Sequence, residues 1–185
     1  CSTEEPSSCC APQESSSGDC CPPATDEQSR CPPSNFALKP GYKLESFVKD
    51  WISTSVAKVP VVKSKLDRKD TLGRIAMRWG IGRDHYALAP GLYAIGSPDE
   101  TSEVLISANY KLSFDHLRSS LPEINAWILV IDTKGINVWC AAGKGTFGTK
   151  EIIRCVELYN LKTLVQHNRI IVPQLGAPGV SAHLV

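Results

Sequence analysis

Cys140 is the residue of this sequence whose type and setting most suggest chemistry. The apolar, β-branched run at residues 128–131 predicts a strand buried on both faces. Residues 132–135 interrupt that run, and Asn137 can then cap a short helix by accepting a hydrogen bond from the backbone N–H of residue 139 or 140. Cys140 falls in the first turn of this predicted helix and is followed by Ala141, Ala142 and Gly143, which have almost no side chain.

Two interpretations of this thiol remain open. A thiolate is the form of cysteine that ligates metals, and a helix face without bulky side chains lets a large planar partner lie against it. A free cysteine that merely fills space in the core is the alternative. The other cysteine of the body, Cys155, lies beside Ile152 and Val156 in a predicted helix and is expected in the core.

The run Asn137-Val-Trp-Cys-Ala-Ala-Gly-Lys144 resembles the cap-helix motif of the mercury-methylating corrinoid protein family (HgcA). That family is related to the large subunit of the corrinoid iron–sulfur protein of acetyl-CoA synthesis. Further segments resemble the family in the expected order, at residues 59–63, 90–93, 107–115, 126–130 and 173–179. The resemblance covers residues 42–185, and it puts the family's cobalt ligand at Cys140.

The resemblance implies a corrinoid-dependent methyltransferase that forms methylmercury from Hg(II), with the Cys140 thiolate as the lower axial ligand of cobalt. A methyl-tetrahydrofolate-type system would supply the methyl group. A ferredoxin with two [4Fe–4S] clusters would supply electrons, since the chain lacks the C-x₂-C-x₂-C run of such clusters. The alternative function is a corrinoid methyl carrier of the acetyl-CoA pathway or of one-carbon metabolism, with mercury incidental.

Three segments are expected to form the cofactor site, because they follow predicted strands and α/β folds bind ligands at the carboxyl ends of their strands. They are residues 107–110, 133–144 and 174–179. Their glycines and Pro178 can also be explained as turn residues. The predicted cofactor-binding residues are Ser107, Asn109, Tyr110, Thr133, Gly135, Asn137, Val138, Trp139, Cys140, Ala141, Ala142, Gly143, Lys144, Gln174 and Gly176.

Three of these residues have more specific expected roles. Asn137 is expected to cap the helix and fix the thiolate. Trp139 either anchors the helix in the core or shields the lower face of the cofactor. Lys144 either approaches a carboxamide or the tail of the corrinoid, or caps the end of the helix.

The N-terminal segment, residues 1–35, is rich in Ser, Pro, Glu and Cys and lacks apolar periodicity, so it is predicted to be disordered. It contains six of the eight cysteines. A disulfide framework, a zinc site and a thiol-rich arm for a soft metal ion are the three interpretations. The third predicts mercury capture by Cys9, Cys10, Cys20 and Cys21. The segment has no positively charged region followed by an apolar stretch, so it is not predicted to be a signal peptide.

Other cofactor motifs fail on spacing. Residues 143–148 satisfy G-x-G-x-x-G, but they do not directly follow a predicted strand, and residue 168 is not acidic. The residue five positions before Gly143 is Val138 and Lys144 is followed by Gly145, which excludes a P-loop. None of the four histidines lies in the D-x-H-x-x-G motif of corrinoid proteins with a histidine ligand.

The body of the chain predicts an α/β fold: a Rossmann-like, mostly parallel sheet with helices on both faces and the cap helix over the cofactor site. Strands are expected at residues 59–63, 87–96, 104–108, 127–131 and 170–172. Helices are expected around Leu44, Phe47, Val48 and Trp51, at residues 71–80 (ended by Gly80), after a cap at Ser113 or Asp115, and at residues 149–161.

Residues 36–185 are predicted to form one corrinoid-binding domain. Six acids and one base give residues 1–35 a charge of −5, which leaves +6 on the rest because the whole chain carries +1. This body could favour an acidic partner such as a ferredoxin, or simply be solvated; no nucleic acid is expected. The family's C-terminal membrane domain is expected to be missing, since no apolar run of about 18 residues occurs. The full-length protein is therefore expected at the cytoplasmic face of the membrane, and this piece in the cytoplasm.

Overall fold

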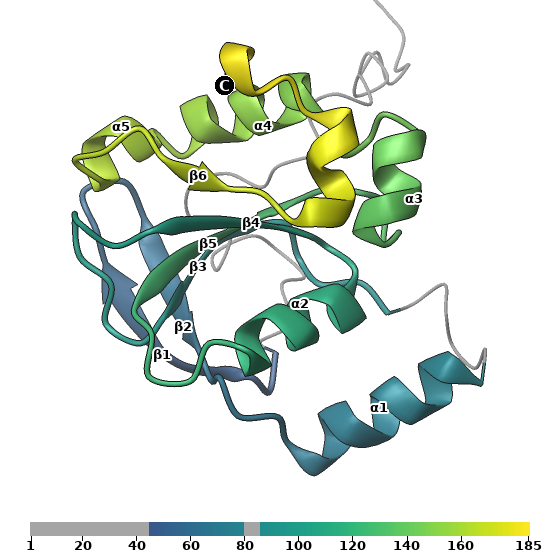
Figure 1. Ribbon diagram of the computed structural model, residues 1–185. Coiled ribbons are helices and arrows are strands. Elements are labelled where there is room, and N and C mark those ends of the chain that lie inside the picture. Colours follow the sequence, from purple (N-terminus) through teal and green to yellow (C-terminus); the bar gives the residue numbers. More distant parts are fainter. Residues whose placement is uncertain (1–44, 80–85) are drawn as a thin grey trace, which may run out of the picture.

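The computed structural model describes residues 45–79 and 86–185, and its centre is a six-stranded sheet (Figure 1). The strands lie in the order β1-β2-β3-β5-β4-β6. They are β1 (Val48–Ser53), β2 (Lys58–Val62), β3 (Gly91–Ile95), β4 (Val104–Ala108), β5 (Ala126–Ile131) and β6 (Ile170–Ile171). The four predicted strands from β2 to β5 and the last strand are therefore all present.

Parallel pairing predominates in this sheet, as predicted. The pairs β2–β3, β4–β5 and β4–β6 are parallel, whereas β1–β2 and β3–β5 are antiparallel. The reversal at β3 follows from chain length, because the connection from Ile95 to Val104 is shorter than the dozen or more residues that a parallel crossover needs.

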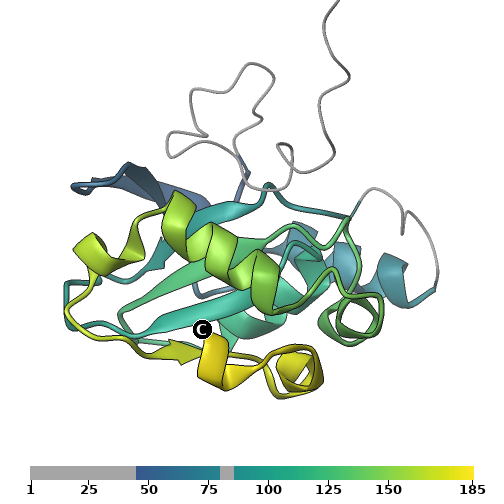
Figure 2. The same ribbon diagram turned by 90° about the horizontal axis from the view of Figure 1, so that it is seen from above.

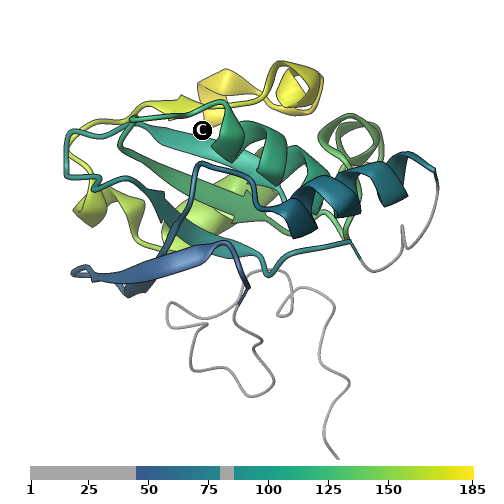
Figure 3. The same ribbon diagram turned by 90° about the horizontal axis from the view of Figure 1, so that it is seen from below.

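Alternating residues of the strands build two hydrophobic cores, one on each face of the sheet. Val61, Leu92 and Leu129 belong to the core under α3 (Val138–Gly143), α4 (Thr149–Leu158) and α5 (Leu161–Leu164). Tyr93 and Ile128 belong to the core under α2 (Lys111–Ser119). Views from above and below show α4 across one face of the sheet and α2 across the other (Figures 2 and 3). The predicted Rossmann-like fold with helices on both faces is confirmed.

Helix α1 (Arg68–Arg78) lies outside α2 rather than on the sheet (Figures 1 and 3). Asp70 of α1 is buried and receives hydrogen bonds from Lys111 Nζ at 2.8 Å and from Arg118 Nη2 at 2.6 Å. Arg118 also donates through Nε to Asp115 at 2.8 Å. Paired charges therefore hold α1 on α2.

The helix predicted around Leu44 and Trp51 is wrong, because residues 48–53 form strand β1. Val48, Trp51 and Ile52 are β-branched or aromatic and suit a strand as well as a helix. Thr54 decides the outcome: its backbone N–H and side-chain hydroxyl both donate to the carbonyl of Ala57, and this turn folds β1 back onto β2.

Other helix boundaries also differ from the prediction. The helix predicted at residues 71–80 begins earlier, at Arg68, with Asp67 as its N-cap. Helix α2 begins at Lys111 with Tyr110 as its N-cap, so neither Ser113 nor Asp115 caps it. Asp115 is instead fully buried in the ion pairs with Lys111 and Arg118. The helix predicted at residues 149–161 is divided, since Asn160 adopts the left-handed conformation (φ 43°) between α4 and α5.

The thiol-rich N-terminal segment, Leu44, Gly80 and His85 lie outside the described residues, so the predictions that rest on them stay predictions. Within residues 45–79 and 86–185, no helix combines the length and the apolar composition needed to cross a membrane.

Candidate functional site

The turn that follows β5 begins the candidate site. Lys134 (φ 57°) and Gly135 (φ 70°) both adopt left-handed backbone conformations, and the Ile136 N–H donates to the Thr133 carbonyl at 3.2 Å. Two consecutive positive φ values are typical of a tight reversal, which glycine tolerates at the least cost. The turn redirects the chain from the end of β5 into α3.

Asn109, directly after β4, holds this turn in place. Its Oδ1 accepts the Thr133 and Gly135 backbone N–H groups, each at 3.0 Å, and its Nδ2 donates to Asp132 at 3.0 Å. The Thr133 hydroxyl lies 2.9 Å from the same oxygen and 2.7 Å from the Ile136 carbonyl. Asn109 and Thr133 are both buried. Asn109 and Thr133 are both predicted to bind the cofactor. Their side-chain polar groups form hydrogen bonds within the loop.

The predicted cap of the next helix is confirmed. Asn137 is the N-cap of α3, and its Oδ1 accepts the Cys140 backbone N–H at 2.9 Å. Cys140 is a free, partly exposed cysteine in the first turn. The inward side of α3 is formed by Val138 and Ala141, which are buried in the core. The helix therefore turns its thiol away from that core.

A cavity of about 540 Å³ opens beside the thiol. Two of its lining side chains, Lys134 and Lys144, carry positive charge. The complete lining is Tyr110, Lys134, Gly135, Ile136, Asn137, Cys140 and Lys144. This cavity brings together five of the predicted site residues, from the ends of β4 and β5.

A second, mostly apolar cavity of about 700 Å³ lies on the other side of Asn137. Its lining from the predicted set is Ser107, Tyr110, Asn137, Val138, Trp139 and Gln174. Trp139 is 69% exposed, so the interpretation of Trp139 as a core anchor is wrong. It is instead an apolar wall of this cavity, together with Leu175, which is also exposed.

Other small residues of the predicted site pack against protein. The 3₁₀ segment η3 (Gln174–Gly179) lies against α3 (Figure 1). A Cβ on Gly176 would collide with the Phe147 ring and would lie 2.8 Å from Val138. A Cβ on Gly179 would collide with the Phe147 carbonyl and would lie 3.4 Å from Ala142. Ala141, Ala142 and Gly176 thus allow η3 and the core to approach α3, whereas Gly143 is open to solvent.

Helix α2 contributes residues that the sequence did not single out. Leu112, Ser113, His116, Leu117 and Ser120 all line the apolar cavity. Their spacing of three and four residues puts them on one helix face. The signal was present in the sequence, but the predicted helix started too late for this face to be recognised.

The donor set suits a metal that brings its own ligands. Among the described residues, no group of three or more His, Cys, Asp or Glu side chains lies close enough to hold a bare metal ion. A corrinoid brings nitrogen ligands for its own cobalt, so the protein would need to supply a single further ligand at most. A single accessible thiol, with an open cavity beside it and an apolar one adjacent, fits that requirement.

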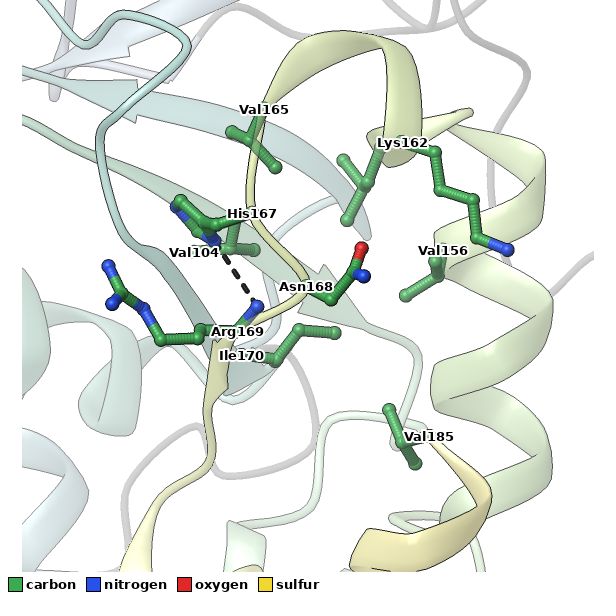
Figure 4. A pocket seen from close by; sticks show the side chains of 10 residues that line it. Val104, Val156, Lys162, Val165, His167, Asn168, Arg169, Ile170 and Val185 are labelled. Atoms are coloured by element: carbon green, nitrogen blue, oxygen red, sulfur yellow. Dashed lines mark hydrogen bonds between the residues drawn. The ribbon is translucent and has the colours of Figure 1, made fainter.

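A third cavity, of about 360 Å³, lies at the opposite end of the sheet (Figure 4). Val104 and Ile170, the first residues of the parallel strands β4 and β6, line it. His167 accepts the Arg169 backbone N–H at 3.2 Å, and Arg169 Nη2 donates to Glu103 at 2.7 Å. These groups are engaged in holding the loop before β6, remote from Cys140.

Comparisons with known proteins give this geometry a context. Residues 48–181 match the family described as CO dehydrogenase/acetyl-CoA synthase delta subunit. The acetyl-CoA decarbonylase/synthase complex subunit gamma of Methanopyrus kandleri is 33% identical over 97 residues, 51% of this chain and 21% of that protein. Subunit gamma 2 of Methanosarcina thermophila is 35% identical over 99 residues, again 51% and 21%. The Archaeoglobus fulgidus gamma subunit is 27% identical over 117 residues, 60% and 25%.

These matches correct the interpretation as a mercury-methylating enzyme. They name subunits of acetyl-CoA metabolism and not the mercury-methylating family, so that choice of family, and the enzyme class drawn from it, are wrong. The predicted resemblance covers residues 42–185 and the matched region covers residues 48–181, so the correction concerns the choice of family and not the part of the chain that matches. The chain covers a quarter or less of each relative described here.

The predicted cofactor class agrees with this assignment, because corrinoid iron–sulfur proteins bind a corrinoid. The match to residues 48–181 includes the whole sheet and both cavities beside α3. The chain belongs to the CO dehydrogenase/acetyl-CoA synthase delta subunit family.

Proposed function

We propose that this chain is the corrinoid-binding part of a methyl-carrying subunit of the acetyl-CoA decarbonylase/synthase type. Residues 36–185 would form that unit. One observation carries the proposal: the free thiol of Cys140 lines an open cavity at the carboxyl ends of β4 and β5, within the region that matches the family. The gamma subunits that it resembles are named as parts of an acetyl-CoA decarbonylase/synthase complex.

The residues around the cavity have distinct proposed tasks. When bound, a corrinoid supplies a cobalt centre that accepts and releases a methyl group. The Cys140 sulfur would ligate that cobalt as a thiolate, which is the metal-binding form of cysteine. Asn137 fixes the first turn of α3 by its bond to the Cys140 N–H. Asn109 fixes the loop before Asn137, and the apolar wall of Trp139 and Leu175 would keep water from the cofactor.

The proposed partners supply electrons and the methyl group. The described residues contain no cluster of His, Cys, Asp or Glu that could hold a metal centre for electron transfer. We propose that electrons come from a separate iron–sulfur protein such as a two-cluster ferredoxin, and the methyl group from a methyl-tetrahydrofolate-type donor. Because the relatives described here are at least four times longer than the matched region, their other segments would contribute to full turnover.

The test is the anaerobic absorption spectrum of the chain reconstituted with cobalamin, measured beside Cys140→Ala. We expect the unaltered chain to bind cobalamin with a sulfur-to-cobalt charge-transfer band, and the variant to bind it without that band. Cys140→Ser is a close steric match that lacks the soft sulfur ligand, so it should also lack the band.

A matched control keeps the outcome specific. Glu157→Gln changes an exposed residue of α4 that lines neither cavity beside α3, and it should retain the band. Identical spectra from the unaltered chain and Cys140→Ala would refute ligation by Cys140. Failure of the folded chain to bind cobalamin at all would refute the proposed function.

A further inference from the structure

Helix α1 turns its apolar side away from the protein. Leu72, Ile75 and Trp79 are 66%, 52% and 81% exposed. Their spacing puts them on one side of the helix, while the buried residues Asp70 and Met77 lie on the opposite side. An exposed apolar group of this kind on a soluble protein typically marks an interaction surface.

The orientation of α1 is fixed by its inner side. Asp70 accepts hydrogen bonds from Lys111, from Arg118 and from the Asp67 backbone N–H at 3.0 Å. Rotating α1 to bury its apolar side would bring the Asp70 carboxylate into solvent and leave the buried Arg118 without that partner, which is costly. The fold therefore presents Leu72, Ile75 and Trp79 to the outside.

The charges around these three residues have one sign. Arg68 and Arg78 are exposed at the two ends of the helix, and Arg74 and Arg78 flank Ile75 in a shallow hollow. The acidic residues of this region pair with other groups. Asp70 is buried in its ion pairs with Lys111 and Arg118, and Asp67 Oδ2 lies 3.7 Å from Lys63 Nζ. We call Arg68, Leu72, Ile75, Arg78 and Trp79 the α1 surface.

We infer that the α1 surface is a docking site for an acidic protein surface with an apolar centre. Charge complementarity selects the occupant, since a basic rim around an apolar centre fits carboxylates around an apolar side chain. A protein rather than a lipid surface follows from the proposed function, in which the chain is a subunit of a complex; the inference rests on that membership. It adds a second functional surface, outside the cavities beside Cys140.

The test uses nitrogen-15 NMR of the full chain without corrinoid, so that a failure here leaves the cobalamin result untouched. The probe is an amphipathic helical peptide with a leucine face flanked by glutamates. We expect it to shift the Trp79 indole N–H resonance, which Trp79→Phe identifies, together with the α1 amides. Leu72→Glu/Ile75→Glu should weaken peptide binding at least roughly tenfold, and added salt should weaken it because the flanking charges are exposed.

The matched controls distinguish peptide binding at this surface from nonspecific hydrophobic binding. Leu184→Glu alters another exposed leucine, 60% exposed, and should leave binding unchanged. A peptide with lysines in place of the glutamates should not bind. Equal binding of both peptides, or of neither at millimolar concentration, would overturn the inference. So would a shift of the Trp79 resonance by phosphatidylglycerol vesicles alone, or a dimer in sedimentation that Leu72→Glu abolishes.

Discussion

Among single residues, Asn109 strongly affects the position of Cys140, although it does not line the cavity beside the thiol. The amide is buried, and both its oxygen and its nitrogen are used to hold the loop between β5 and α3. That loop determines where Asn137 and Cys140 lie. A residue of this kind positions the thiol through the loop.

Replacing Asn109 by Ala should loosen α3. The substitution leaves the buried N–H of Thr133 and the partly buried N–H of Gly135 without this acceptor, and an unsatisfied buried group costs about 1–3 kcal/mol. We expect a lower free energy of unfolding in urea and faster hydrogen exchange at the Cys140 amide.

Asn109→Asp is a second variant that tests the same contacts more specifically. It keeps an acceptor oxygen for Thr133 and Gly135 but brings a carboxylate to the place where Nδ2 now donates to Asp132. Repulsion between the two carboxylates should make this variant less stable than the unaltered chain at neutral pH, and the difference should shrink at low pH, where the introduced carboxylate is protonated. Unchanged exchange at the Cys140 amide in both variants would show that the loop does not depend on Asn109.

Gly176 and Gly143 are a matched pair for the packing of α3. Gly176→Ala forces a methyl group into the Phe147 ring, and overpacking of this kind costs about 1–3 kcal/mol. Gly143→Ala meets nothing within 4 Å and should leave the stability nearly unchanged. Chemical unfolding of the two variants measures the difference. Equal stabilities would mean that η3 moves freely relative to α3.

At the scale of elements, buried charge joins α1 to α2. Burial alone would raise the pKa of the Asp70 carboxyl, but hydrogen bonds from Lys111, the Asp67 backbone and Arg118 outweigh it and hold the pKa at about 2. The same partners act in the other direction on Lys111: burial alone would lower its pKa, and Asp115 and Asp70 raise it. Each charge in this group therefore depends on the others.

The sign of the pH dependence follows from the lowered pKa of Asp70. The ionised carboxylate stabilises the folded state fully above its unfolded pKa, about 3.9, and this stability is lost as the pH falls through about 2. We expect the free energy of unfolding to decrease between about pH 4 and pH 2. Asp70→Asn should lower stability at neutral pH by roughly 3 kcal/mol, since it leaves Arg118 buried with one partner fewer.

The comparison across pH distinguishes this pair from general acid unfolding. Asp70→Asn should have a flatter stability profile below about pH 4, because the titrating carboxylate is gone. Glu157→Gln, which alters an exposed carboxylate of α4, should keep the original profile. A profile for Asp70→Asn that is parallel to that of the unaltered chain would contradict the argument.

For the whole molecule, the parallel pairing of β4, β5 and β6 determines the place of the site. Strands β4 and β5 end at the same edge of the sheet. The shorter β6 stops level with Leu105, and the chain after Ile171 continues to that edge, so the segments after Ala108, Ile131 and Ile171 meet there. The α1 surface lies beyond α2 on one face of the sheet (Figure 3), so the proposed cofactor site and the proposed docking surface occupy separate parts of the fold.

Local sequence determined the elements around Cys140. The apolar run at β5, the capping oxygen of Asn137 and the small residues of α3 are local signals, and the strand, the cap and the helix all form as predicted. The same holds for β2, β3 and β4. In each case neighbouring residues supply the hydrogen bonds or the burial pattern that selects the conformation.

Contacts between distant residues decided the rest. Val48 and Trp51 suit a helix or a strand, and pairing with β2 selects the strand. Asp115 could have capped a helix, but its partner Arg118 also pairs with Asp70 of α1, 48 residues away, and this contact holds both side chains in the interior. Trp139 is a large aromatic residue of the kind that anchors a helix in a core. Val138 and Ala141 already fill the inner side of α3, however, so Trp139 stays exposed. The sequence alone thus determined the thiol, its cap and the fold class, while the tertiary structure decided which side chains face the cavities, because only packing assigns a side chain to the inside or the outside.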